Sequence, residues 1–157
     1  MASTTNKVLR LYRQALRWPL GRQLFSAYAA RKAPYFATIS PLINSLEPNH
    51  CEILLRKRRR VQNHIGTVHV IAIANGLEMA MGFLAEASIP KHLRWIPKGM
   101  ELSYPAKAPT DIRCSARVVA DAWKPGDLPV QVEAVDAEGN TVVAGTIHLW
   151  VSEKPPR

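Results

Sequence analysis

The chain has 157 residues, of which 21 are Lys or Arg and 12 are Asp or Glu, so its formal net charge is +9. This length corresponds to one domain with a sizeable core. A hydrophobic fraction of 47%, with 12 Pro and 8 Gly scattered along the chain, excludes a disordered or collagen-like protein.

The excess positive charge is confined to the first third of the chain. Residues 1–60 contain 12 Lys and Arg but only two acidic residues, Glu47 and Glu52, whereas residues 61–157 carry a net charge of −1. This asymmetry is typical of proteins with a polyanionic partner: a nucleic acid, an anionic membrane surface or a phosphorylated small molecule. Because the basic stretch 52–61 has no aromatic residue on which bases could stack, a nucleic acid is disfavoured.

Cysteine and histidine usage argues against a disulfide framework and a metal site. Cys51 and Cys114 match neither pattern, so we expect both to be small buried residues in a reducing compartment. The histidines lack ligand spacing, so no metal is expected. The N-terminus has no apolar signal-peptide core, and arginines interrupt residues 8–24. We therefore expect a cytoplasmic protein.

The first 34 residues predict an N-terminal helical extension. Within residues 6–30 apolar residues recur every three or four positions, and Pro19 and Gly21 divide this pattern into two short amphipathic helices. Residues 35–157 are then expected to form one globular domain. Its first elements are predicted strands over residues 36–46 and 50–61.

A helix over residues 68–88 is predicted to be buried on nearly every side. Its only strongly polar side chains are His69, Asn75, Glu78 and Glu86. The helix is long enough to span a membrane, but a carboxylate at its centre would cost about 2.5–3.5 kcal/mol in the bilayer. We therefore expect no membrane span, and the rest of the chain must wrap around this helix.

The remainder of the chain predicts four more strands, over residues 93–104, 111–121, 128–136 and 141–151. Turn sequences at residues 124–127 and 137–140 connect the last three as an antiparallel meander. The element order predicts an α+β fold in which a curved antiparallel sheet wraps around a long central helix.

Glu78 is a candidate catalytic residue because it lies in the middle of the apolar helix. Burial would disfavour its ionised form and suit it to act as a base or nucleophile near neutral pH. A structural pairing with an Arg, or a place at a subunit interface, would explain it equally well. Asn75 lies three residues earlier and is expected on the same helix face.

The segment before this helix predicts an oxyanion or anion site. Gly66 allows a close backbone approach, and Thr67 is expected to cap a helix that begins at Val68. The free N–H groups of residues 68–71 would then lie at the positive end of the helix dipole. Gly-Thr before a helix is also a common cap without any ligand.

The loop and the central helix share a sequence signature with a known family. Its residues are Asn63, Gly66, Thr67, His69 and, nine residues after the His, Glu78. The pattern resembles that of the hotdog-fold acyl-CoA thioesterases of the phenylacetyl-CoA and 4-hydroxybenzoyl-CoA thioesterase superfamily. The resemblance runs from about residue 36 to the end of the chain, includes residues 104–107, and is closest to an uncharacterised thioesterase-like branch.

This resemblance implies a hotdog fold and roles in thioester hydrolysis. Glu78 would be the general base that activates water or the nucleophile that attacks the thioester carbonyl. Asn63 would hold the water or the thioester, and His69 would orient the acyl group. The backbone N–H of Val70 would take the oxyanion position. Where the family has Gly-Gly, this chain has Val70 and Ile71, whose side chains would narrow the approach of the thioester.

Substrate contacts are expected from further residues. Gly66, Thr67 and Asn75 would contact the substrate. Arg56, Arg58 and Arg60 are predicted on one face of an exposed strand end, where they could bind the phosphates of coenzyme A. The basic run could instead only keep the sheet edge soluble.

The resemblance also implies an oligomeric, cofactor-independent hydrolase. Its substrate would be an acyl-CoA or a similar thioester, and coenzyme A would enter only as part of that substrate. The chain would form a homodimer, or a homotetramer as a dimer of dimers, with the acyl site at the subunit interface. The alternative is a non-catalytic hotdog protein that binds acyl-CoA or lipid. The acyl chain and the carrier, coenzyme A or acyl carrier protein, stay open.

Overall fold

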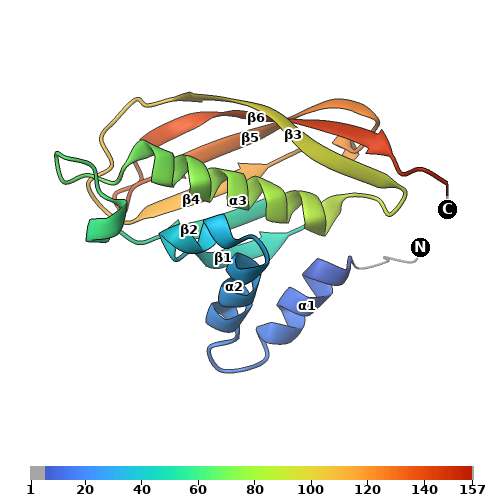
Figure 1. The fold of residues 1–157 in the computed structure, drawn as a ribbon, viewed down its shortest axis with the longest axis horizontal. Coiled ribbons are helices and arrows are strands. Elements are labelled where there is room, and N and C mark those ends of the chain that lie inside the picture. Colours follow the sequence, from blue (N-terminus) through green and yellow to red (C-terminus); the bar gives the residue numbers. More distant parts are fainter. Residues whose placement is uncertain (1–5, 157) are drawn as a thin grey trace.

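The computed structural model describes residues 6–156, in which six antiparallel strands curve around one long helix (Figure 1). The strand order is β1-β2-β4-β5-β6-β3. The strands are β1 (Leu42–Glu47), β2 (His50–Leu55), β3 (Leu93–Ser103), β4 (Ile112–Arg117), β5 (Gly126–Val135) and β6 (Thr141–Glu153). The expected α+β hotdog fold is confirmed, and β4, β5 and β6 form the expected meander.

The central helix α3 (Val70–Ser88) lies in the concave face of the sheet and packs on β2 and β4. Ile73, Leu77, Met81 and Leu84 are almost fully buried along it. Burial of each such side chain contributes about 1.5–3 kcal/mol. By length and composition alone α3 could cross a bilayer, but more than half of it is buried inside the protein.

α3 approaches the sheet closely at Gly76. A Cβ atom built at this position would lie 2.8 Å from Sγ of Cys114 on β4, closer than real side chains approach. The helix therefore needs a residue without a side chain here. Both cysteines are buried, as expected.

The two predicted N-terminal helices are present as α1 (Lys7–Ala15) and α2 (Gly21–Lys32). Edge-to-face aromatic contacts connect them to the core: the Tyr12 and Phe25 rings are 5.2 Å apart, and the Phe25 and Phe83 rings 6.3 Å. Ser26 Oγ accepts a hydrogen bond from the Ile43 N–H at 2.8 Å. α2 thereby covers the β1 edge of the sheet, whereas β3 forms the other edge.

The strand predicted over residues 36–46 is wrong in its first half. Residues Pro34–Ile39 form the 3-10 helix η1, with Pro34 in its first turn. Ser40 follows with a left-handed φ of 47°, which turns the chain into β1. The apolar run over residues 36–39 packs as a short helix because these two residues bound it.

Two other predicted strands are too long. β2 ends at Leu55, not Val61, because its partner β4 begins opposite Leu55. Beyond this point the Lys57 N–H donates to the Asp111 side chain, Oδ1, at 2.8 Å and not to a neighbouring strand. Residues Arg59–Val61 form the 3-10 helix η2. β4 ends at Arg117, and Ala120–Ala122 form the 3-10 helix η3.

Candidate functional site

Asn63 organises the loop that precedes α3. Its Oδ1 accepts hydrogen bonds from the N–H groups of Ile65 and Thr67, both at 3.1 Å, and its Nδ2 donates to Thr67 Oγ1 at 2.8 Å. Gly66 has a φ of +78°, which favours glycine at this turn. Because both ends of the Asn63 amide bond the loop, this residue positions the loop. Its role in holding water or the thioester stays a prediction.

The central helix begins at Val70 and is capped by His69, so the predicted start at Val68 and cap at Thr67 are wrong. The His69 Nδ1 accepts a hydrogen bond from the Ile71 N–H at 3.0 Å. Thr67 cannot cap because its hydroxyl bonds Asn63, and the Val68 N–H donates to the Ala108 carbonyl at 2.9 Å. An accepting Nδ1 carries no proton, so the neutral His69 ring presents a donor at Nε2.

A hollow of about 500 Å³ lies at the N-terminus of α3. It is lined by the loop, by segment 104–108 and by β6: Asn63, His64, Ile65, Thr67, Val68, His69, Val70, Ile73, Tyr104, Pro105, Ala106, Lys107, Ala108, Val142 and Val143. Within residues 6–156 no hydrogen bond uses the Val70 N–H. This free donor and the positive end of the helix dipole suit the hollow to a developing negative charge. Gly66 shapes the loop but does not line the hollow.

Glu78 lies outside this hollow and is partly exposed, so the expected enclosure is not found in a single chain. It follows Val70 by eight residues, which corresponds to about 12 Å along the helix axis. Ile71, Ala74, Gly82 and Glu86 share its side of α3 and are likewise not buried. We call these five residues the open stripe of α3. One chain therefore does not bring the Glu78 carboxylate to the free N–H of Val70.

Asn75 is buried and directed at η1, whereas Glu78 is on the open stripe, so the prediction that the two side chains share one helix face is wrong. The Asn75 Nδ2 donates to the Tyr35 carbonyl at 3.3 Å and to Thr38 Oγ1 at 3.2 Å. It also lines a smaller hollow of about 360 Å³, to which Arg60 and His69 contribute. A contact between Asn75 and a substrate stays a prediction.

The three arginines predicted on one face are divided between two places. Arg56 and Arg58 line a groove of about 550 Å³ beside α2, together with Arg31. Arg60 lines the smaller hollow beside His69. They separate because the chain leaves the sheet at Leu55. Sequence reasoning also missed Lys107 as the cation of the larger hollow, although segment 104–107 stood out as part of the family resemblance.

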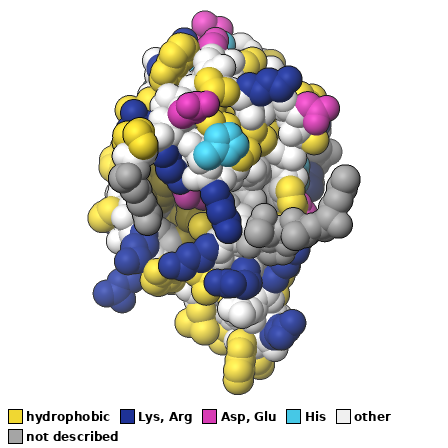
Figure 2. All heavy atoms as spheres, turned by 90° about the vertical axis from the view of Figure 1, so that its right-hand side faces the viewer, with side chains coloured by type: hydrophobic (Ala, Val, Ile, Leu, Met, Phe, Trp, Pro, Cys, Tyr) yellow, Lys and Arg dark blue, Asp and Glu magenta, His cyan; other side chains and the backbone are white. Residues whose placement is uncertain are grey.

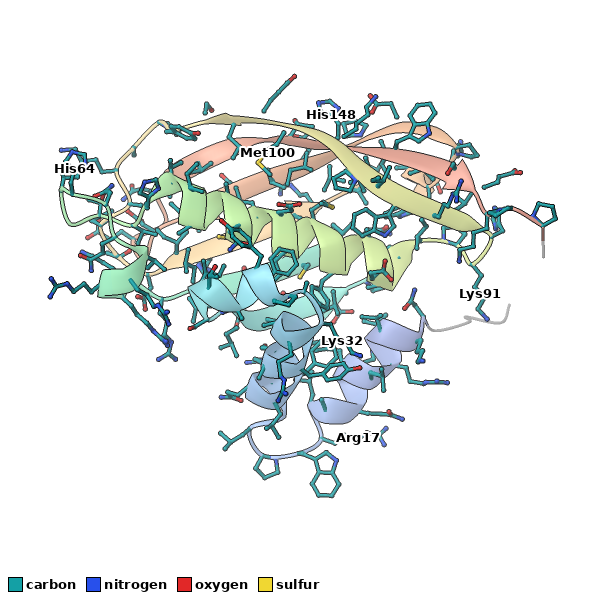
Figure 3. All side chains as sticks on the ribbon, viewed as in Figure 1. Arg17, Lys32, His64, Lys91, Met100 and His148 are labelled. Atoms are coloured by element: carbon teal, nitrogen blue, oxygen red, sulfur yellow. The ribbon has the colours of Figure 1, made fainter. Side chains whose placement is uncertain are left out.

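No metal site is found among residues 6–156, because no three His, Cys, Asp or Glu side chains gather there. The two thiols do not contribute a reactive group either. Burial raises the pKa of Cys51 and Cys114 well above the ordinary value. The polar groups available in the larger hollow are the backbone N–H of Val70 and side chains of the lining, namely Asn63, His64, Thr67, His69, Tyr104 and Lys107 (His64 and its loop are at one end of Figure 3).

Residues 21–151 match the family described as Domain of unknown function (DUF4442). The chain belongs to this family. A similar structure is that of the genomics target APC5556, which is 39% identical, with 94% of this chain and 99% of that chain covered and a TM-score of 0.82. The family match begins at the first residue of α2, so it includes this helix as well as the sheet.

Two more distant structures share the fold of this family member. A Pseudomonas aeruginosa protein of unknown function, described as a probable thioesterase, is 21% identical over 87% of this chain and 97% of that chain, with a TM-score of 0.75. A thioesterase family protein from Silicibacter pomeroyi is 16% identical over 91% of this chain and 99% of that chain, with a TM-score of 0.71. No curated protein sequence matches the chain.

Proposed function

We propose that the chain is a thioester hydrolase that acts on an acyl-CoA or a similar thioester. The observation that carries this proposal is that Val70, whose N–H makes no hydrogen bond within residues 6–156, lines a hollow together with His69. Acyl transfer needs such donors where negative charge develops on the carbonyl oxygen. The fold shared with proteins described as thioesterases supports this choice of reaction.

In the proposed reaction a water oxygen attacks the thioester carbonyl carbon, and the Glu78 carboxylate takes the water proton. The Val70 N–H and the His69 Nε2–H stabilise the oxyanion. The carbon–sulfur bond then breaks and the carboxylic acid is released, while the leaving thiolate takes the proton held by Glu78, which restores the carboxylate. The reaction consumes only water and needs no metal or redox cofactor.

The proposed site requires two chains, with Glu78 of one protomer near the α3 N-terminus of its partner. Trp95 of β3 joins the free sheet edge to the open stripe, because its Nε1 donates to Glu86 Oε1 at 2.9 Å. A Cβ atom at Gly82 would lie 3.7 Å from the same indole. An unpaired edge strand beside an incompletely covered helix favours pairing with a second copy. We therefore propose a homodimer along β3 and α3.

Arg60 and Lys107 are the proposed contacts of the coenzyme phosphates nearest to the reaction centre. Lys107 lines the larger hollow and Arg60 the smaller one, and His69 lines both. Arg56 and Arg58 lie farther away beside α2 and would reach only a distal phosphate. Charge reversal of Arg60 should therefore raise KM more than charge reversal of Arg58.

A non-catalytic acyl-CoA or lipid-binding protein is the second candidate, and one observation favours it. Because His69 accepts from the Ile71 N–H, the first turn of α3 offers fewer free donors to a substrate. Val70 and Ile71 also stand where the acyl-CoA thioesterase signature has Gly-Gly, so their side chains would narrow the approach of a thioester. This candidate predicts binding of coenzyme A esters without release of a thiol.

Thiol release from a panel of acyl-CoA esters, measured for Glu78→Gln and for Glu86→Gln, tests the proposed reaction. Both residues are on the open stripe, so the second variant is a matched control for loss of charge. Glu78→Gln should abolish turnover and leave folding intact, while Glu86→Gln keeps most of the activity. Unchanged rates in Glu78→Gln would refute the assignment. Binding without turnover in the wild type would support the second candidate.

A further inference from the structure

The outer end of the α1–α2 hairpin exposes a cluster of large apolar side chains. The exposed fractions are 44% for Leu16, 73% for Trp18, 69% for Leu20, 65% for Leu24 and 54% for Tyr28. Leu24 and Tyr28 are four residues apart and therefore share one side of α2, while Leu20 directly precedes the helix. We call these five residues the hairpin tip. Figure 2 shows apolar side chains protruding at the lower end of the molecule, where α1 and α2 lie. Contiguous exposed apolar surface of this kind indicates a binding site.

The charge around the hairpin tip is of one sign. Residues 6–32 contain seven Lys and Arg and no Asp or Glu. Arg17 and Arg22 flank the turn between the helices, and Arg17 lies at its outer end (Figure 3). Figure 2 shows basic side chains gathered over this part of the molecule. Exposed apolar side chains on a segment whose charged residues are all cations fit an anionic lipid surface, whereas a second copy of the hairpin would bring like charges together.

The backbone of the turn supports a functional role for Leu20. The Gly21 N–H donates to the Trp18 carbonyl at 3.0 Å, with Pro19 and Leu20 in between. Leu20 has a φ of 59°, a value at which such turns favour Gly or Asn. An exposed Leu in this conformation weakens folding and gains little packing in return. Strain at an exposed residue points to a role outside folding.

The tip is fixed on the domain and stays accessible. A Cβ atom at Gly21 would lie 1.7 Å from the Ala15 carbonyl oxygen, so the two helices are locked closely together. The contacts of Tyr12 and Phe25 and the bond of Ser26 to β1 hold the base of the hairpin. The hairpin projects from the side of the molecule away from β3 (Figure 1). A dimer along β3 would leave both tips free.

We propose that the hairpin tip is a peripheral membrane-binding site for anionic lipid. Trp18, Leu20 and Leu24 enter the boundary between headgroups and acyl chains, while Arg17 and Arg22 contact lipid phosphates. This inference goes beyond the proposed hydrolysis and does not depend on it.

Co-sedimentation of the full chain with vesicles tests the proposal, with phosphatidylcholine alone or mixed with phosphatidylserine. The protein should partition onto the phosphatidylserine vesicles and be released by salt. Leu20→Gly should lower the partition coefficient by about tenfold and should hold or raise the melting temperature, because glycine adopts the required φ. Arg17→Glu should also weaken binding. Val119→Ser and Lys124→Glu, which alter exposed residues elsewhere, are matched controls and should bind as the wild type does.

Three outcomes would overturn the proposal. The first is absence of partitioning onto phosphatidylserine vesicles. The second is partitioning that Leu20→Gly and Trp18→Ser leave unchanged, which would show adsorption by charge alone. The third is lipid-free association, in sedimentation velocity, that Leu20→Gly abolishes, which would assign the tip to contacts between copies. Glu78→Gln should partition like the wild type, so a failure of the proposed hydrolysis is distinguishable from a failure of this inference.

Discussion

The His69 Nδ1 accepts a hydrogen bond from the backbone N–H of Ile71 at 3.0 Å. This one bond caps α3, places the ring proton of neutral His69 on Nε2 and removes one donor from the first turn. The Val70 N–H is left free beside it. Helix stability and the proposed chemistry thus depend on the same side chain and can be separated by substitution.

Replacing His69 by Ala should lower the free energy of unfolding by about 0.5–2 kcal/mol, because the cap is lost. His69→Asn should restore most of that stability, since Asn is a favourable cap, but neither variant should recover full thiol release because both lack the Nε2 donor. Urea unfolding and the thiol-release rate measure the two effects. Full activity in His69→Asn would contradict the proposed role of Nε2.

The contact between Gly76 and Cys114 predicts opposite effects at two glycines of α3. Gly76→Ala should destabilise the protein by about 1–3 kcal/mol through the clash with Sγ. Gly82→Ala is the matched control, because its Cβ atom would meet only Trp95 at an ordinary 3.7 Å. It should stabilise by about 0.5–1 kcal/mol through helix propensity. Cys114→Ala should recover part of the stability of Gly76→Ala in a double-mutant cycle. Equal effects at both glycines would exclude the contact as the cause.

Thiol reactivity should report on unfolding of the domain. Burial raises the pKa of Cys51 and Cys114 and blocks access to both sulfur atoms. Neither residue should react with an aromatic disulfide reagent in the native protein, and both should react at once in guanidinium. Rapid labelling of either thiol without denaturant would show that the strand bearing it is accessible.

The turn after β5 should make stability depend on acid pH. The side chain and backbone N–H of Asn140, and the backbone N–H of Glu138, donate to Asp136 and lower the pKa of its carboxyl group. The pKa of Asp136 in the folded protein is below its ordinary value of 3.8, so its contribution to stability is complete above that pH and is lost as the pH falls through the folded pKa.

The melting temperatures of the wild type and Asp136→Asn, compared from neutral to acid pH, measure this effect. The difference should be largest near neutral pH and should shrink in acid. Asp121→Asn serves as the control on an exposed residue. A difference that does not change with pH would assign the effect to packing instead of ionisation.

Much of the fold could be predicted because the local patterns were strong. The apolar length of α3 fits a membrane span or a buried helix, and the carboxylate of Glu78 decides for the second. The alternation in the last strands predicts strands directly. The segment at Phe36 was misread because a short apolar run fits either a strand or a buried helical turn. Its conformation depends on Pro34 and Ser40 at its ends.

The site was harder to predict than the fold because its details depend on distant contacts. Thr67 fitted the sequence rules for a cap, but its hydroxyl bonds Asn63 and the Val68 N–H bonds Ala108, forty residues away. The distance between Glu78 and Val70 also follows from helix geometry once both are on α3. Glu78 and the Val70 N–H of a single chain are too far apart to act on one thioester, so their joint action across two protomers stays a prediction.

The two edges of the sheet have different consequences for assembly. The Ser26 hydroxyl accepts a hydrogen bond from the Ile43 N–H, and α2 lies along β1. The β1 edge therefore has little room for another strand. A protein with two open edges can add copies without limit and form fibres. Here a pair of chains joined at β3 would present only closed edges on the outside. Strand pairing would then stop at two copies, and any larger assembly would have to use the faces of the sheet.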